Sequence, residues 1–162
     1  MRKGLWMWPF EQGENLPDVQ TLDLEGRWAN LRIDRGDRPG YVRVNEGLAS
    51  VARHPAYDYE VKLSISYENV RADGLPSLPE EVRAVDAIEG DVRASLEAGR
   101  QSLLAVVVTR DGVKEMTFYT RDPSGVAAWF EQQKQSPLTH RLEILIRPDP
   151  AWGAFRTYTN AV

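Results

Sequence analysis

The sequence contains no cysteine and only two histidines, His54 and His140. Without cysteine there can be no disulfide, no thiolate nucleophile, no iron–sulfur cluster and no cysteine-ligated zinc site. The two histidines lie 86 positions apart, so they form no HExxH helix, and they are too few for a three-histidine metal centre. We therefore expect no metal site and no cofactor.

Long hydrophobic runs are also missing. The longest aliphatic run, Leu103–Val108, is six residues long, whereas a transmembrane helix needs about 20. The stretch Gly4–Phe10 follows two basic residues, but it is too short for a secretory signal and is interrupted by Pro9. We expect a cytoplasmic protein without membrane contact.

A strong excess of one charge sign is absent as well. The 24 acidic and 20 basic residues give a net charge of −4 and a pI near 5.3. A protein that coats DNA needs a net basic face, so no DNA partner is expected. The 162 residues are 42% hydrophobic and 27% charged, which is typical of one folded domain.

The chain is therefore expected to form a single domain over residues 1–162. It begins with a tryptophan-rich arm over residues 1–26, which contains Trp6, Trp8 and Phe10. These aromatic side chains either fold back onto an apolar surface of the same chain or anchor a partner protein.

A β-hairpin is predicted over residues 27–45. Apolar and polar residues alternate on both sides of a turn that contains glycine and proline. If the aliphatic faces of the two strands coincide, Arg32 and Arg43 share the opposite face.

The remaining pattern, over residues 57–148, predicts the order βαββαβ. The expected elements are a strand at 57–68, a helix capped by Ser77 with Glu80 three residues on and ended by Gly99, strands at 102–110 and 113–120, a helix capped by Asp122 and ended at Ser136, and a strand at 140–147. With right-handed crossovers, this order gives an α+β, ferredoxin-like antiparallel sheet with two helices on one face.

Two further features concern the surfaces of this sheet. The tail at 149–162 carries Trp152, Phe155 and Tyr158 at three-residue spacing, which predicts a short docking helix. The strand at 102–110 is the most apolar one, yet the topology puts it at a sheet edge, where an uncovered strand invites aggregation. We expect the N-terminal hairpin to cover it, with a homodimer as the alternative.

Residues that could support catalysis are few. Asp86 and Glu89 lie one helical turn apart and could form an acid–base pair or bind a divalent cation. The favoured alternative is a solvated helix face on which they pair with Arg83 and Arg93. No arrangement identifies a nucleophile with its base, so the sequence favours a protein that is not an enzyme.

Arginine is the one biased residue type, at sixteen of the twenty basic residues, and a salt-bridged surface is the simplest interpretation. The βαββαβ order is also that of the RNA-recognition motif. However, the expected motif strand, Gly112–Tyr119, lacks the aromatic spacing and contains Glu115. Only Tyr119 is left as a stacking residue on the open face of the sheet.

Several segments form motifs in a fixed order: Val42–Leu48, Asp73–Ser77 followed by Ala87–Glu89, Phe118–Pro123 and Asp149–Trp152. Together they resemble the bacterial proteins grouped as domain of unknown function 695, over about residues 27–158. That family has no assigned activity, so the resemblance implies no catalytic residues. Some relatives are joined to a domain similar to the protein inhibitor of ribonuclease E, which this chain lacks together with the inhibitor's acidic tail.

We predict a non-enzymatic regulatory or binding module that acts through contacts with an unidentified protein partner. The predicted binding surface is the sheet face away from the helices, with Lys62, Tyr119 and Arg121, joined by Arg32 and Arg43. One alternative is RNA binding through the same face. The other is an enzyme with an arginine–carboxylate pocket that gathers several of Arg32, Arg43, Asn45 and Glu46.

Overall fold

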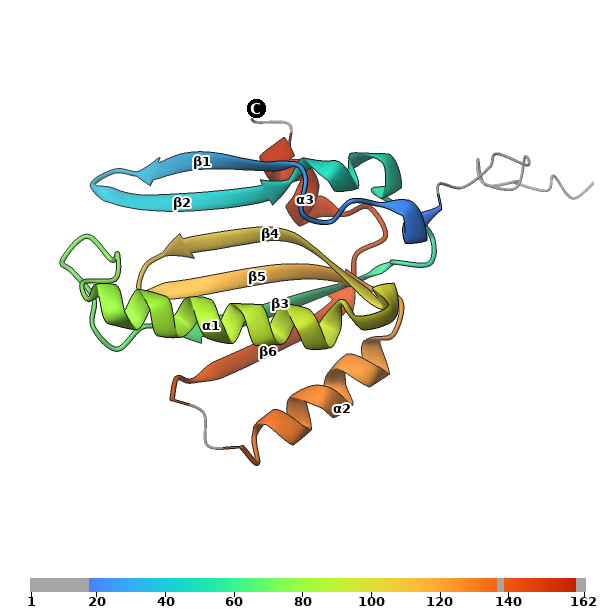
Figure 1. Ribbon diagram of the computed structural model, residues 1–162. Coiled ribbons are helices and arrows are strands. Elements are labelled where there is room, and N and C mark those ends of the chain that lie inside the picture. The colour runs from blue at the N-terminus through green and yellow to red at the C-terminus, as the bar shows by residue number, and fades with distance from the viewer. Residues whose placement is uncertain (1–17, 137–138, 160–162) are drawn as a thin grey trace, which may run out of the picture.

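The computed structural model describes residues 18–136 and 139–159 (Figure 1). The strands are β1 (Trp28–Arg35), β2 (Arg38–Asn45), β3 (Tyr59–Ser66), β4 (Ser102–Arg110), β5 (Val113–Thr120) and β6 (Leu142–Pro148). The α-helices are α1 (Pro79–Leu96), α2 (Pro123–Gln133) and α3 (Gly153–Thr159). Short 3-10 helices are η2 (Val19–Thr21), η3 (Glu46–Val51) and η4 (Ala98–Arg100).

The strands form one open, antiparallel, six-stranded sheet in the order β1-β2-β4-β5-β3-β6. Figure 1 shows α1 and α2 on one side of this sheet, while α3 contacts β2 and β4. The predicted α+β architecture with an antiparallel sheet is confirmed, and the strands at 102–110 and 113–120 have the predicted bounds.

The side of the sheet under α1 and α2 holds one hydrophobic cluster. Apolar residues of α1 recur at helical spacing and pack on alternate residues of the strands, which is why this segment is a helix. Its buried members include Val85, Val92 and Leu96 from α1, Val126 from α2, and Val61, Leu63, Ile65, Leu104, Val107, Met116 and Phe118 from the strands.

The opposite side of the sheet holds a second cluster, closed by the C-terminal segment. Trp152 and Phe155 are buried there, and the indole Nε1 of Trp152 donates to the carbonyl oxygen of Tyr57 at 2.8 Å. The tail, for which the sequence predicts a short docking helix, forms α3 and packs on this side of the sheet. An irregularity in β4 between Leu104 and Val106 lets consecutive residues, Ala105 and Val106, both join this cluster.

The hairpin completes the sheet beyond its most apolar strand. β2 pairs with β4, with Val42 opposite Val108 and Val44 opposite Val106. The prediction that the hairpin covers this edge is confirmed, since backbone pairing removes the exposed edge of β4. Leu31 lies opposite Val42, so the aliphatic faces of the hairpin coincide as expected.

The helix caps were predicted with mixed success. The Asp122 side chain accepts from the backbone N–H of Gly125 at 3.0 Å and caps α2, as predicted. The prediction of a Ser77 cap is wrong, because α1 begins at Pro79 and its N-cap is Leu78, without a side-chain hydrogen bond. The predicted box of Ser77 with Glu80 is therefore absent, and the next residue, Glu81, accepts from the backbone N–H of Glu68 at 2.6 Å, which ties the start of α1 to the segment after β3.

The tryptophan-rich arm lies mostly outside the described residues, including Trp6, Trp8 and Phe10. Within the described residues, no helix is long and apolar enough to cross a membrane.

Candidate functional site

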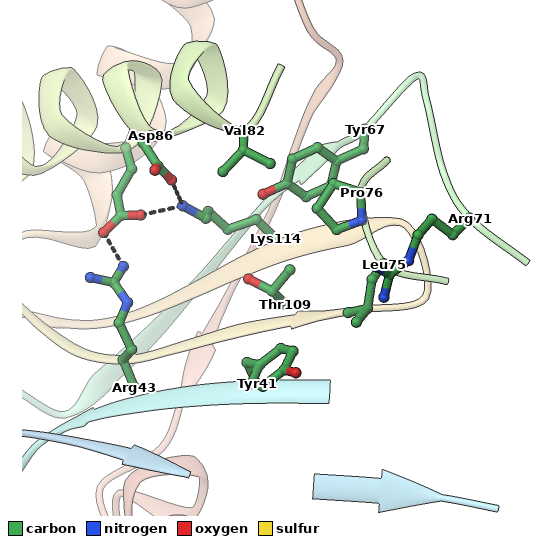
Figure 2. A pocket seen from close by; sticks show the side chains of 11 residues that line it. Tyr41, Arg43, Tyr67, Arg71, Leu75, Pro76, Val82, Asp86, Thr109 and Lys114 are labelled. Atoms are coloured by element: carbon green, nitrogen blue, oxygen red, sulfur yellow. Dashed lines mark hydrogen bonds and ion pairs between the residues drawn. The ribbon is translucent and has the colours of Figure 1, made fainter. Parts of the chain in front are cut away.

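A hollow of the described structure lies between α1 and β2. The hairpin extends the sheet beyond the strands that α1 covers, so the helix-side surface of β2 stays open. A pocket of about 670 Å³ forms over this open surface of β2, beside α1 (Figure 2). Its lining residues come from β2, β4, β5, α1 and the segment after β3: Tyr41, Arg43, Tyr67, Arg71, Leu75, Pro76, Val82, Asp86, Glu89, Thr109 and Lys114.

Strand register brings these distant residues together. Tyr41 lies opposite Thr109, and Thr109 lies opposite Lys114, so three strands place one residue each in the same row. Arg43 lies two residues further along β2, opposite Val107, on the same side of the sheet. The pocket floor therefore depends on the β2–β4 pairing, which joins residues more than 60 positions apart in the sequence.

A charged network occupies one end of the pocket. Lys114 is only 5% exposed, and its ammonium donates to Asp86 Oδ1 at 2.5 Å and to Glu89 Oε2 at 2.6 Å. Arg43 donates to the other carboxylate oxygen of Glu89 (Figure 2). Strand β5 and strand β2 thus each supply a cation to one carboxylate of α1.

The network fixes the charge of Glu89. Burial by itself disfavours the ionised carboxylate, but the hydrogen bonds and positive charges of Lys114 and Arg43 outweigh it and lower the pKa of Glu89. Both Glu89 oxygens already accept a hydrogen bond from a cation. Glu89 is therefore an anchored anion that holds the pocket wall.

Tyr67 brings an uncharged hydroxyl to the same pocket. Burial, followed by the negative charges of Asp86 and Glu89, raises the pKa of Tyr67 to about 12. Its hydroxyl consequently keeps its proton at neutral pH, and Figure 2 shows it directed into the pocket, on the side of Lys114.

The other end of the pocket is mainly apolar and is shaped by a tight loop, which also places Arg71, paired with Asp73, beside Leu75 (Figure 2). Leu75 and Pro76 form its wall, and Tyr41, which is 48% exposed, lies below them (Figure 2). The loop is tied to the β4–β5 turn by a hydrogen bond from Gly112 N–H to the Gly74 carbonyl at 2.6 Å. Gly74 has φ +90, a conformation that glycine adopts without steric cost.

The binding surface predicted from the sequence is divided by the sheet. Arg43 lies beside Val107, which belongs to the cluster under α1, so Arg43 and Arg32 lie on the helix side. Lys62 and Tyr119 lie on the opposite side. The expectation that all of them share the face away from the helices is wrong, because β2 pairs with β4 in a register that turns its polar residues toward α1.

Tyr119 is not an exposed stacking residue. It is fully buried, its ring stacks on Trp152 with centroids 4.0 Å apart, and its hydroxyl donates to Asp149 Oδ2 at 3.0 Å. Burial, followed by the negative charge of Asp149, raises the pKa of Tyr119. The open-face prediction failed here because the C-terminal segment covers this part of the sheet.

The other predicted residues have separate partners. Lys62 lies 3.7 Å from Glu60 and 3.5 Å from Glu115, measured from its ammonium nitrogen to a carboxylate oxygen. Arg121 lies over the Tyr57 ring, 5.6 Å from its centroid. Arg32 pairs with exposed Asp34. Of the five predicted residues, only Arg43 lines the pocket.

The arginine–carboxylate pocket that the sequence suggested is assembled from other partners. Asn45 is buried and holds the start of η3, because its side chain accepts from Gly47 N–H at 3.2 Å. Asp86 and Glu89 do converge, but on Lys114 and Arg43 rather than on the predicted Arg83 and Arg93. No cluster of three metal-ligating side chains occurs within residues 18–136 and 139–159.

The sequence interpretation missed Lys114 and Tyr67 as site residues, although the sequence pattern around Lys114 could have indicated its role. In strand 113–120, Lys114 shares a face with apolar Met116 and Phe118. A lysine on an apolar strand face requires a buried anionic partner. Asp86 and Glu89 had been singled out only for other roles, as an acid–base pair or cation site or as surface partners of Arg83 and Arg93.

Comparison with other proteins adds a family but no activity. A search of the curated proteins and a search of the solved structures each found no match to the chain. A sequence model described as a family of unknown function, DUF695, matches residues 26–159 and confirms the resemblance seen in the sequence motifs, so the chain belongs to this family.

Proposed function

We propose that this protein is a non-enzymatic binding module that recognises a ligand in the pocket between α1 and β2 and exerts a regulatory role through that contact. The observation that carries the proposal is the network in which buried Lys114 and partly exposed Arg43 meet on Glu89 in the pocket wall. Such a network presents fixed, oriented charges to a ligand.

The shape of the pocket supports this proposal. Its volume of about 670 Å³ falls in the usual range for small-molecule sites, about 300–1,000 Å³. It joins an apolar end at Leu75 and Pro76 to a polar end at Arg43 and Lys114. Pockets that bind small molecules commonly combine such a surface with a few convergent polar groups.

The ionisable groups favour binding over catalysis. A general base needs a free carboxylate or imidazole within reach of its substrate. Here both oxygens of Glu89 are occupied, Asp86 accepts from Lys114, and Tyr67 keeps its proton at neutral pH. Each group is already committed to a partner or to one protonation state.

A fragment screen observed through backbone amide NMR signals tests this proposal. We expect hits to shift signals of β2, the 67–76 segment and α1 together. Tyr41→Ala should weaken those hits several-fold, because Tyr41 contributes pocket surface while being 48% exposed.

Leu145→Ala is the matched control, since Leu145 is 50% exposed on β6 and lies outside this pocket. It should leave the same hits unchanged. A screen with no shifts at the pocket, or hits that both variants weaken equally, would contradict the proposal. Shifts that appear with single-stranded RNA and weaken with added salt would support RNA binding instead.

We also propose that residues 57–148 form a ferredoxin-like unit. Three observations support it: the chain order β3-α1-β4-β5-α2-β6, the spatial order β4-β5-β3-β6 and the shared helix-side cluster of α1 and α2. In this view the β1–β2 hairpin is an addition to the ferredoxin-like unit, and its β2 strand provides the open surface over which the pocket forms.

A further inference from the structure

The lining of the pocket points to the chemistry of its ligand, an inference that rests on the function proposed above. We propose that the pocket takes an organic anion, with a carboxylate or phosphate group at the Arg43–Lys114 end and an apolar or aromatic body at the Tyr41–Leu75 end. Charge, unused hydrogen-bond donors, accessibility and pocket shape each support this class of ligand.

Charge is the first argument. Arg43, Lys114 and Arg71 line the pocket, whereas Asp86 and Glu89 are its only lining carboxylates within the described residues. Arg71 is paired in turn with Asp73, which lies outside the lining, so positive and negative charges are equal in number once this partner is counted. Both carboxylates are already bound to Lys114, so a cationic ligand would have to compete with an internal ion pair.

Unused donors are the second argument. An ammonium carries three N–H donors and a guanidinium carries five. Lys114 uses two on Asp86 and Glu89, and Arg43 uses one on Glu89. Thr109 and Tyr67 add hydroxyl groups to the lining. A ligand group with several acceptor oxygens fits this surplus, and a guanidinium suits carboxylates and phosphates in particular.

Accessibility is the third argument, because it selects the group that the ligand would meet first. The Arg43 side chain is 40% exposed, while that of Lys114 is 6% exposed. Arg43 can therefore make a direct contact with an entering anion, and Lys114 supplies charge from below. Arg43 also lies over Trp28, 5.6 Å from the ring centroid, which restrains its guanidinium.

The apolar end explains why the ligand needs an organic body. Leu75, Pro76 and Val82 contribute apolar surface to the pocket lining, together with the Tyr41 ring (Figure 2). A bare inorganic anion would leave this surface in contact with water, whereas an apolar or aromatic body would cover it.

A titration with four matched probes, followed by backbone amide NMR, tests the inference. The probes are 3-phenylpropanoate, its neutral amide 3-phenylpropanamide, the cation 3-phenylpropylamine and phenyl phosphate. We expect the carboxylate to bind about tenfold more tightly than the amide, and the amine to bind most weakly. Phenyl phosphate shows whether the anion site prefers carboxylate or phosphate.

Arg43→Gln should abolish most of the preference for the carboxylate over the amide. The fold should persist because Lys114 still pairs with Glu89, and the amide spectrum checks this directly. Arg32→Gln is the control, since Arg32 lies on the same side of the hairpin, pairs with Asp34 and does not line the pocket. It should keep the preference intact.

The outcomes separate the two proposals. Equal binding of carboxylate and amide at the pocket would overturn the anion inference but leave the binding module standing. The absence of pocket shifts with every probe at millimolar concentration would contradict both. If Arg43→Gln does not fold, the comparison among probes with the unaltered protein still decides the question.

Discussion

Lys114 is the residue that joins the two carboxylates of α1 to the sheet. Replacing it by methionine keeps much of its apolar stem but leaves Glu89 with Arg43 alone. Removing one partner of a buried ion pair costs about 3–5 kcal/mol. We expect a loss of about 3 kcal/mol in the free energy of unfolding, because Asp86 is half-exposed and can be solvated.

Urea denaturation measures this loss, and Lys134→Met provides the comparison. The ammonium of Lys134 pairs with exposed Glu131 one turn earlier, a kind of pair that contributes about 0.5 kcal/mol or less. Similar losses in both variants would show that the Lys114 network does not stabilise the fold.

Because of Glu89, the free energy of unfolding should depend on pH in the acid range. Its pKa is lower in the folded chain than its usual value of 4.5, so the unfolded chain binds more protons in this range. The stabilisation from Glu89 is therefore complete above about pH 4.5 and is lost as the pH falls through the lower, folded-state pKa. Glu89→Gln should flatten this part of the stability–pH curve.

Thermal unfolding between pH 3 and 6 would display the effect. The control is Glu80→Gln, at an exposed position in the first turn of the same helix. A curve for Glu89→Gln as steep as that of the unaltered protein would mean that this carboxylate is not held ionised by its two cations.

At the scale of elements, the loop after β3 positions the apolar end of the pocket through Gly74. A Cβ at this position would lie 3.1 Å from the Cα of Asp111, and the backbone has φ +90. Gly74→Ala should therefore destabilise the protein by about 1–3 kcal/mol and weaken pocket ligands. Chemical denaturation and a ligand titration would measure the two effects.

Gly90 is the natural comparison, because it lies in the middle of α1 on the exposed side, where an added Cβ would have no neighbouring atom within 4 Å. Gly90→Ala should stabilise the protein by about 0.5–1 kcal/mol through higher helix propensity. The two substitutions should change the free energy of unfolding in opposite directions. A change in the same direction would mean that the turn at Gly74 tolerates a side chain.

The sequence predicted the secondary-structure elements better than the tertiary contacts between them. Strands 102–110 and 113–120 and the Asp122 cap follow from local alternation and turn signals. The Ser77 cap failed because the residues before α1 pair with the segment after β3: Ser77 N–H donates to the Asn69 carbonyl at 3.0 Å, and Pro76 bridges Val70. Local patterns carry no information about such contacts.

The same limit applies to the candidate site. Arg43, Asp86 and Glu89 were each noted, but their convergence depends on the register of β2 on β4 and on the placement of α1. The burial of Tyr119 depends on Trp152, 33 positions later in the chain. Non-local packing of this kind cannot be inferred from the spacing of residues along one sequence.

At the scale of the whole molecule, one sheet separates two hydrophobic clusters. Leu104 and Val107 of β4 face α1 and α2, whereas Leu103 and Val106 face the C-terminal segment. Because the same strand contributes to both clusters, disturbance of one side should be transmitted to the pocket on the other. The pocket and the C-terminal segment are therefore parts of one cooperative unit.

Trp152→Ala tests this coupling. Trp152 is fully buried, stacks on Tyr119 and donates to Tyr57, and removing such a side chain costs about 3–5 kcal/mol. Amide hydrogen exchange should show β2 and α1 losing protection together, although α1 lies on the other side of the sheet. Loss of protection in β2 alone, with α1 unchanged, would instead divide the molecule into two units that unfold independently.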